Sequence, residues 1–409
     1  MPSPFSAEPA APLGFDRDPS RSRTLPGHYY FDPGIFESEK RKVFHHSWQY
    51  VGHVSMLPEP DSYMTRNILD QSVVLLRDRK GEIRAFFNVC QHRAHQLLQG
   101  EGRLAAAAIT CPYHAWTYDL TGALRSARGA ESIVDFDIES VRLSPVRLAG
   151  FLGFLFVNLD GAAPDFETVA GELAAEVAAF SPNAAKLHCA YRREYPLAAN
   201  WKNSVENYSE CFHCPISHRG LVESALDYPS YRISVHPHHH THRSRNKGEA
   251  QGYSSRNETA ANTQEFASWL LWPNWCLEVY PGGNLTVFHH VPLGPEQTVQ
   301  RVEWYFPQMH LSPQDQEVID FVHAVRLEDI PICESVQAGL HSLGYRQGRF
   351  VVDAELSEIS EHAVHDFQAK LLIKFARLRQ RFHRDSEMVN AMRHECSSIK
   401  PASRQPRRP

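Results

Sequence analysis

The sequence has 409 residues, of which 42% are hydrophobic, so it is long and apolar enough to bury the cores of two domains. Its formal net charge of −5 gives no electrostatic reason to expect a nucleic acid partner. No apolar run reaches the roughly 18 residues that a membrane-spanning helix needs. The start, MPSPFSAEPAAPLG, lacks the basic and apolar segments of a secretory signal. We therefore expect a cytoplasmic protein without a nucleic acid or membrane partner.

The first part of the chain is predicted to be rich in β-structure. Residues 1–25 are rich in Pro, Ser and Ala, and we expect a loose arm. Residues 36–44 have helical spacing of apolar side chains. Residues 72–76 and 83–89 are predicted strands around a Lys80-Gly81 turn. Residues 150–158 close this block, so we expect an N-terminal segment over 1–44 and a small β domain over 45–163.

The second part mixes helices and long strands, and we expect one domain over 164–399. Residues 165–180 are acidic and apolar at helical spacing, and residues 285–291 and 302–306 alternate as strands do. Ser312 followed by Pro313 predicts the start of a helix. A second apolar stripe, from Val364 to Phe382, predicts a long C-terminal helix. Residues 400–409 are basic and Pro-rich and are predicted to form a flexible tail.

Two Cys-His pairs, Cys90-x-His92 and Cys111-x-x-His114, have the spacing of metal ligands. Eight cysteines in so long a chain do not make a disulfide framework. Reduced Cys and His residues in this number allow a tetrahedral zinc site or a [2Fe–2S] cluster in which two His replace two Cys on one iron. Because each pair supplies one Cys and one His, the order favours the cluster over zinc and over four unrelated residues.

A second group of polar residues follows Asn200-Trp201-Lys202. Glu210 and His213 are three residues apart and are expected on one helical face. Pro215 is expected to stop that helix and let the chain bring His218 back beside His213. Two imidazoles and a distant carboxylate form the facial triad of non-haem Fe(II) oxygenases, which leaves positions open for O2.

Two further patterns admit a metal or redox role, but we interpret both as structural. Cys211 and Cys214 form a Cys-x-x-Cys motif without the βαβ setting of a redox motif, so we expect them to be packing residues. The tract His236, His238, His239, His240 and His242 resembles a metal-binding tract. Since it is polar and is followed by two arginines, we expect a solvated surface loop.

The segments NVCQHRAHQLLQG and CPYHAWTYDLTGAL resemble the two cluster loops of Rieske non-haem iron oxygenases. The match extends to Arg93, Pro112, Tyr113, Trp116 and Tyr118. Ala94 and Ala115 stand where Gly is frequent in that family. The resemblance implies an α+β fold: an all-β Rieske domain in the N-terminal half and a helix-grip catalytic domain, whose antiparallel sheet is flanked by helices. It also implies that the N-terminal segment packs on the catalytic domain.

The same resemblance assigns the site residues. Cys90, His92, Cys111 and His114 would bind the [2Fe–2S] Rieske cluster. His213, His218 and a downstream acid would bind the mononuclear non-haem Fe(II); Asp329 is the chosen acid and Glu328 its competitor. Glu210 would link an iron-ligand His to a cluster-ligand His of a neighbouring subunit in a homotrimer.

The implied activity is that of a terminal oxygenase that uses O2 and electrons drawn from NAD(P)H by a separate flavin and iron–sulfur reductase. The segment ENYSECFHCP is most similar to the branch that acts on quaternary ammonium compounds such as betaines, carnitine and choline. We expect hydroxylation of an N-methyl group, in an aromatic box that holds the small-molecule substrate by cation–π attraction. Its candidates are Tyr208, Trp269, Trp272 and Trp275. Hydroxylation or dihydroxylation of an aromatic ring is the alternative within this class, and a Rieske ferredoxin and a zinc-binding module are the alternatives outside it.

Overall fold

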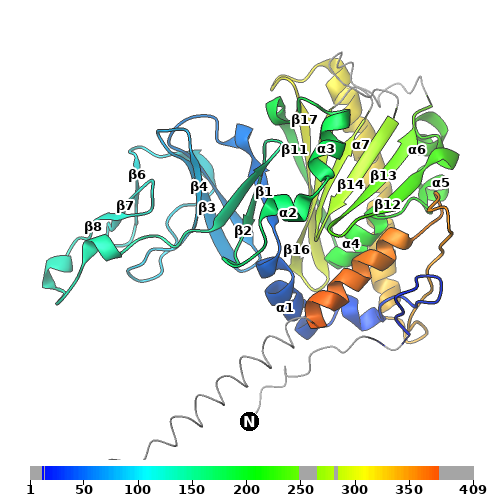
Figure 1. Cartoon of the computed structure of the whole chain (residues 1–409), viewed down its shortest axis with the longest axis horizontal. Helices are drawn as coiled ribbons and strands as arrows, with labels where there is room; N and C mark the ends of the chain where they lie inside the picture. Colours follow the sequence, from blue (N-terminus) through cyan, green and yellow to red (C-terminus); the bar gives the residue numbers. More distant parts are fainter. Residues whose placement is uncertain (1–11, 13, 248–264, 281–283, 377–409) are drawn as a thin grey trace, which may run out of the picture.

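The computed structural model describes residue 12 and residues 14–247, 265–280 and 284–376. Figure 1 shows an elongated molecule with a β-rich domain at one end and a larger mixed domain at the other. The predicted α+β fold, with an all-β domain followed by a domain built on an antiparallel sheet with helices, is confirmed. The predicted tail and the end of the C-terminal helix, with Leu378 and Phe382, lie outside the described residues.

The β domain consists of short antiparallel strands in three small sheets, ordered β1-β10-β9, β4-β3-β2-β5 and β6-β7-β8 within the described residues. The predicted strands at 72–76 and 83–89 are present as β3 and β4, paired around the predicted turn. The strands are β1 (Gln49–His53), β2 (Ser62–Ile68), β3 (Gln71–Arg77), β4 (Ile83–Phe87), β5 (Glu101–Arg103), β6 (Ala108–Thr110), β7 (Thr117–Asp119), β8 (Leu124–Ser126), β9 (Arg147–Phe151) and β10 (Phe154–Asn158).

The mixed domain is built on one antiparallel sheet of seven described strands, ordered β11-β17-β16-β15-β14-β13-β12. These strands are β11 (His188–Leu197), β12 (Arg232–Val235), β13 (His239–Arg245), β14 (Glu265–Leu271), β15 (Trp275–Val279), β16 (Leu285–Gly294) and β17 (Gln297–Phe306). Its helices are α2 (Phe166–Ala170), α3 (Leu173–Phe180), α4 (Trp201–Tyr208), α5 (Cys214–Ser217), α6 (Arg219–Ser224) and α7 (Pro313–Leu340), followed by helical residues 362–376.

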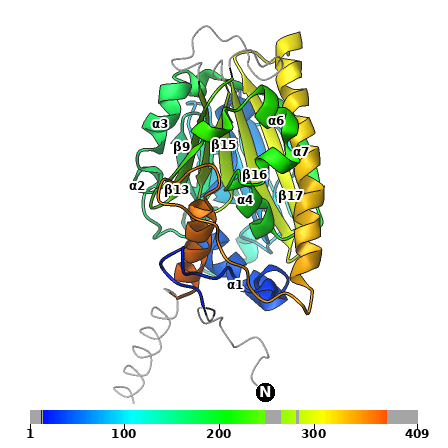
Figure 2. The ribbon, with the colours of Figure 1, turned by 90° about the vertical axis from the view of Figure 1, so that its right-hand side faces the viewer.

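Helices cover both faces of this sheet (Figure 2). On one face, α4 and α7 pack against Leu270, Phe288 and Trp304. On the other, α2, α3 and the strands β1 and β10 pack against Trp269 and Trp275. The sheet therefore separates two cores, and each strand presents alternate side chains to one or the other.

The helix α7 begins as the sequence predicts. Ser312 caps it, accepting from the backbone N–H of Asp315 at 3.1 Å, and the Asp315 carboxylate accepts in return from the Ser312 N–H at 2.9 Å. Pro331 lies inside the helix and cannot donate a backbone hydrogen bond. Although α7 has 28 residues, no helix of the described part of the chain is long and apolar enough to cross a bilayer.

The N-terminal segment is bound to the mixed domain. The helix α1 (Pro33–Lys42) places Glu39 against Lys202, with both side chains buried and 2.5 Å apart. The expectation of a loose arm is wrong for residues 14–25, because Leu25 is fully buried and its N–H donates to Gln368 at 2.8 Å. The domain boundaries at residues 44 and 163 stay a prediction.

Candidate metal centres

The two Cys-His loops adopt matching turns in the β domain. The N–H of Cys90 donates to the carbonyl of His95 at 2.9 Å, and the N–H of Cys111 donates to the carbonyl of Trp116 at 2.8 Å. Both cysteines are buried and free, whereas His92 is exposed and its ring centroid lies 4.7 Å from that of His114. The structure thus brings the four predicted cluster residues to one end of the domain, with thiols inside and imidazoles toward solvent.

The donor set of these loops fits a Rieske cluster. The Nδ1 atom of His114 is buried and has no hydrogen-bond partner, as expected of an atom that binds a metal. The Tyr118 hydroxyl lies 3.3 Å from Cys90 Sγ, and burial raises the pKa of Tyr118 so that it stays protonated. A hydroxyl that donates to a ligand sulfur stabilises the thiolate and tunes the cluster.

Ala94 and Ala115 take the left-handed backbone conformation, with φ of 55° and 60°. Glycine adopts this conformation without the steric cost of a Cβ, which explains why Gly is frequent at these positions in the family that the loops resemble. Each alanine N–H still donates to the carbonyl of the preceding cysteine, so the loop geometry persists with alanine.

A second centre lies at the opposite end of the molecule, where α5, α6 and α7 meet. His213, His218 and Asp329 form a group that we call the triad. The Nε2 atoms of the two histidines are 3.2 Å apart. Asp329 Oδ1 lies 2.9 Å from His218 Nε2 and 3.6 Å from His213 Nε2. Ligands at right angles on bonds of about 2.1 Å stand about 3 Å apart, so the triad fits one face of an octahedral metal ion.

The local chain path around the triad differs from the prediction in one respect. Glu210 and His213 lie in the turn that follows α4, which ends at Tyr208. Pro215 does not stop a helix but occupies the first turn of α5, where a missing N–H costs nothing. The break comes at His218, whose φ of −119° and ψ of 58° are non-helical and turn its side chain back toward His213.

Charges around the triad favour a cation. Burial would raise the pKa of Asp329, but Arg326, whose Nη2 is 2.6 Å from Asp329 Oδ2, and the two histidines lower it, so the carboxylate is ionised. Burial would lower the pKa of His213, but the nearby carboxylates of Asp329 and Glu210 raise it to about 10. A positive charge is therefore stabilised between these two carboxylates, as a bound metal ion would be.

The Nδ1 atoms of both histidines face carboxylates that fix the imidazole rings. Glu210 Oε1 lies 2.5 Å from His213 Nδ1, and Glu328 Oε2 lies 2.7 Å from His218 Nδ1. A carboxylate on the far ring nitrogen orients a metal-binding His. Because Glu328 lies on that far side while Asp329 faces both Nε2 atoms, the geometry favours Asp329 over Glu328 as the third ligand.

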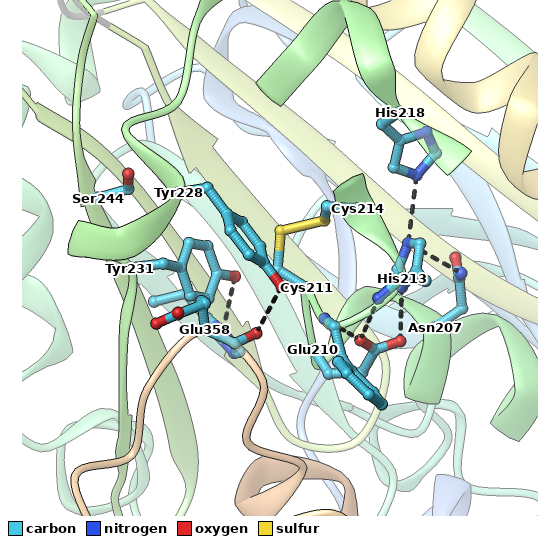
Figure 3. The surroundings of a disulfide bond; sticks show 12 residues. Asn207, Glu210, Cys211, His213, Cys214, His218, Tyr228, Tyr231, Ser244 and Glu358 are labelled. Carbon is cyan, nitrogen blue, oxygen red and sulfur yellow. Dashed lines mark hydrogen bonds and ion pairs between the residues drawn. A yellow bond between two sulfur atoms is a disulfide. The ribbon is translucent and has the colours of Figure 1, made fainter. Parts of the chain in front are cut away.

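Cys211 follows Glu210, Cys214 follows His213, and the two cysteines form a disulfide with a Cα–Cα distance of 5.0 Å (Figure 3). Our interpretation of them as simple packing residues is therefore corrected. Both are buried, as expected, but the turn that joins them places the two sulfurs together. In Figure 3 the disulfide lies between Tyr228 and Tyr231 on one side and His213 on the other.

All three triad residues border one cavity, which we call the triad cavity. Its aromatic walls are Tyr208, Tyr231 and Phe266, and its acids besides Asp329 are Glu210 and Glu278. Of the four predicted substrate-binding residues, only Tyr208 borders this cavity. Sequence reasoning missed Glu278, although a single acid inside the apolar strand 275–279 was an available signal.

The three predicted tryptophans do not border the triad cavity, so the prediction that they line the substrate pocket is corrected. Trp269 and Trp275 are an odd number of residues from cavity residues on their strands, so they point to the opposite face of the sheet. Trp272 packs on Phe367 with ring centroids 5.2 Å apart, outside the residues that border the cavity.

The histidine tract is also corrected, because it is not a solvated loop. His239–Arg245 form strand β13, paired on both sides, and His239, His240 and His242 are buried. Polar side chains fit this strand because each meets a partner: His242 Nδ1, for example, lies 3.0 Å from the Tyr231 hydroxyl.

Two family models match the chain. The model described as Rieske [2Fe-2S] domain matches residues 47–138, and the model described as ring hydroxylating alpha subunit (catalytic domain) matches residues 184–374. The carnitine monooxygenase oxygenase subunit of Escherichia coli (strain K12) is 39% identical over 368 residues, which cover 89% of this chain and 97% of that protein. The chloroplastic choline monooxygenase of Spinacia oleracea is 29% identical over 348 residues, covering 82% of this chain and 76% of that protein.

Solved structures agree with these matches. The quaternary ammonium Rieske monooxygenase CntA in complex with L-carnitine has a TM-score of 0.80 at 33% identity, covering 90% of this chain and 99% of that one. Naphthalene 1,2-dioxygenase from Rhodococcus sp. has a TM-score of 0.73 at 19% identity, covering 86% and 94% of the two chains, which is a likeness of fold.

Proposed function

Because the chain belongs to the Rieske non-haem iron oxygenases, as an oxygenase (alpha) subunit, we propose that it hydroxylates an N-methyl carbon of a quaternary ammonium compound such as a betaine. The observation that carries this proposal is the triad cavity, which combines three aromatic side chains with buried acids beside the iron triad. That combination suits a permanent cation that cannot donate hydrogen bonds.

The residues that hold the cofactors follow from the geometry. We assign Cys90, His92, Cys111 and His114 to the [2Fe–2S] cluster and the triad to the mononuclear iron. When bound, the two centres supply single electrons and the activation of O2. The protein's part is to orient the ligands, for which Tyr118, Glu210 and Glu328 are placed.

Electrons are proposed to pass between subunits. Within one chain the cluster loops and the triad lie at opposite ends of the molecule (Figure 1), so a cluster from a neighbouring subunit would have to serve the triad. Glu210 suits the link, because one carboxylate oxygen already bonds His213 Nδ1 and the exposed cluster imidazole of a neighbour has a free ring N–H to offer. A homotrimer with a separate flavin and iron–sulfur reductase that oxidises NAD(P)H, working in the cytoplasm, completes the proposal.

Substrate recognition is proposed to rest on cation–π attraction and a buried acid. Tyr208, Tyr231 and Phe266 would surround the methylated ammonium group. Burial raises the pKa of Glu278, whereas the nearby Arg326 and the hydrogen bond from Tyr280 lower it, and the carboxylate of Glu278 would attract a cation.

The proposed reaction consumes O2, a pair of electrons and two protons, places one oxygen atom on the methyl carbon and releases the other as water. The resulting hydroxymethyl ammonium breaks its C–N bond, which yields a demethylated tertiary amine, formaldehyde and a proton. The same hydroxylation on a chain carbon next to nitrogen would instead release trimethylamine. The products therefore report which carbon is attacked.

A substrate panel with a surrogate reductase tests the proposal. L-Carnitine, γ-butyrobetaine, choline, glycine betaine, proline betaine and an aromatic acid would each be incubated with the holoprotein, NADH and O2. Formaldehyde and a demethylated amine in equal amounts from a quaternary compound are the expected products. Trimethylamine would contradict the N-methyl assignment while keeping the substrate class. Turnover of the aromatic acid with none of the quaternary compounds would contradict the proposal as a whole.

A further inference from the structure

A buried arginine lies on the wall of the triad cavity. Arg326 precedes Asp329 by three residues on α7, so the two side chains lie on the same face of that helix. The Arg326 side chain is 10% exposed and borders the triad cavity. Among the described residues that border this cavity, it is the only lysine or arginine. A guanidinium stays protonated in proteins, so Arg326 gives the cavity wall a permanent positive charge.

The hydrogen-bonding capacity of Arg326 is largely unused. Its Nη2 atom lies 2.6 Å from Asp329 Oδ2, which makes an ion pair. Yet Arg326 Nε and Asp329 Oδ2 are both buried and have no hydrogen-bond partner in the described part of the chain, so the ion pair lacks an aligned hydrogen bond. A guanidinium has five N–H donors, and a buried donor without a partner costs free energy. A ligand that accepts hydrogen bonds from Arg326 would remove this cost.

Arg326 is held in place without a ligand. The central carbon of its guanidinium group lies 5.0 Å from the centroid of the Phe288 ring, which belongs to strand β16. The ion pair with Asp329 fixes the guanidinium from its own helix. A donor that is already ordered loses little conformational freedom when it binds a ligand. Arg326 is therefore a preorganised hydrogen-bond donor beside the triad.

Two of the aromatic walls of the cavity lie over other strands than Arg326 does. Phe266 is on β14, and Tyr231 directly precedes β12. In the sheet, β15 separates β14 from β16, the strand beneath Arg326. Because neighbouring strands are about 4.8 Å apart, Phe266 lies about 10 Å across the sheet from that strand. The cavity thus has an aromatic part and a cationic part, which a small ligand can contact at the same time.

A ligand with a lone positive charge suits only the aromatic part. In a buried cavity like charges repel more strongly than they do in water, so Arg326 would repel an ammonium ion. The three acids of the cavity carry up to three negative charges, which Arg326 and a divalent iron on the triad would offset. A carboxylate on the ligand removes the repulsion, because it forms charge-assisted hydrogen bonds with Arg326. A zwitterion therefore fits both parts of the cavity.

We propose that Arg326 binds the carboxylate of the substrate, so that the enzyme selects betaines, which carry a carboxylate as well as the quaternary ammonium group, over choline. This inference rests on the function proposed above and adds a second group to substrate recognition. The aromatic side chains would hold the ammonium end of the substrate, and Arg326 would hold the carboxylate end. Hydrogen bonds between charged groups of this kind contribute about 10- to 100-fold in affinity.

The test compares γ-butyrobetaine with its methyl ester, which keeps the quaternary ammonium group but lacks the negative charge. Glycine betaine and choline form a second pair that differs in the same charge. Calorimetric titration of the anaerobic holoprotein measures the affinity for each compound, and formaldehyde release measures kcat/KM. We expect the wild type to bind γ-butyrobetaine about 10- to 100-fold more tightly than the ester.

Substitutions of Arg326 should change this preference. Arg326→Gln should abolish it. Arg326→Lys, which keeps the charge but not the planar set of donors, should reduce it by about 3- to 10-fold. The control Arg219→Gln changes an exposed arginine on α6 that is outside the residues bordering the cavity, and it should keep the preference of the wild type.

Because both compounds of a pair are measured on one preparation, a loss of iron or of stability in a variant leaves the ratio of the two affinities unchanged. The wild type and Arg326→Lys keep the test valid if Arg326→Gln does not fold. Equal affinity of the wild type for the two compounds, or an unchanged preference in the folded Arg326 variants, would overturn the inference while N-demethylation stands. Failure of every quaternary ammonium compound to bind and to turn over would instead overturn the proposed function, and the inference with it.

Discussion

The neighbouring acids Asp329 and Glu328 give a matched pair of substitutions, because they contact opposite sides of His218. Asp329→Asn removes the charge that faces both Nε2 atoms, whereas Glu328→Gln changes only the partner of His218 Nδ1. We expect Asp329→Asn to lose mononuclear iron and turnover altogether. Glu328→Gln should keep its iron at saturating Fe²⁺, with affinity weakened by about 10- to 100-fold.

The two variants should also differ in stability. Asp329 pairs with Arg326 at 2.6 Å, and the side chains are only 6% and 10% exposed. Removing one member of a buried pair costs about 3–5 kcal/mol. Glu328 is 46% exposed, and removal of such a surface charge costs about 1 kcal/mol or less.

The assay combines iron and sulfide analysis, the visible spectrum of the Rieske cluster and thermal unfolding. The cluster, at the other end of the molecule, serves as an internal control for folding, and its spectrum should be unchanged in both variants. Retention of mononuclear iron and turnover in Asp329→Asn would refute the reasoning. Complete iron loss in Glu328→Gln alone would make Glu328 the ligand.

Three further predictions concern other parts of the chain. Burial raises the pKa of Glu206 from its ordinary 4.5 to about 7, so its contribution to stability is full below about pH 4.5 and is lost as the pH rises through 7. The unfolding free energy of the catalytic domain should therefore fall by up to about 3 kcal/mol more in the wild type than in Glu206→Gln between pH 5 and 8, and equal pH profiles would contradict this. Ala115→Gly should stabilise the β domain by about 1 kcal/mol by relieving a left-handed φ, while the control Ala108→Gly, in strand β6, should destabilise it by about 0.5–1 kcal/mol. The temperature at which the cluster absorbance is lost measures the stability of both variants. A change in the same direction for Ala115→Gly and Ala108→Gly would refute the argument. Phe266→Leu should raise KM for a quaternary ammonium substrate by about 3- to 30-fold with an intact cluster spectrum, whereas Trp275→Phe, on the other face of the sheet, should leave KM unchanged. If steady-state kinetics showed a larger rise in KM for Trp275→Phe than for Phe266→Leu, Trp275 would have to border the substrate pocket.

The sequence was sufficient to predict those parts of the structure whose contacts are local. The cluster loops, the strand pair around Lys80-Gly81 and the Ser312 cap each lie within a few residues, so their spacing alone constrains the geometry. Asp329 lies 111 residues after His218, and only the family resemblance pointed to it.

The errors arose where tertiary contacts decide which face is buried. Alternation shows that Trp269 and Phe266 point opposite ways, but it cannot show which side faces the triad. His239 and His242 were predicted to be exposed to solvent because they are polar, yet their strand is paired on both sides and both faces of the sheet are covered. The hydrogen-bond partners of these histidines, such as Glu176 and Tyr231, come from other elements and cannot be identified from the local sequence pattern.

The central claim is that one chain binds two different iron centres, and the iron-to-sulfide ratio of the purified protein tests it most directly. The wild type should contain about three iron atoms and two acid-labile sulfides per chain. In Asp329→Asn the iron should fall by about one while the sulfide stays constant, and in Cys90→Ala sulfide should be lost. A wild type without acid-labile sulfide, or an Asp329→Asn protein with unchanged iron, would contradict the account.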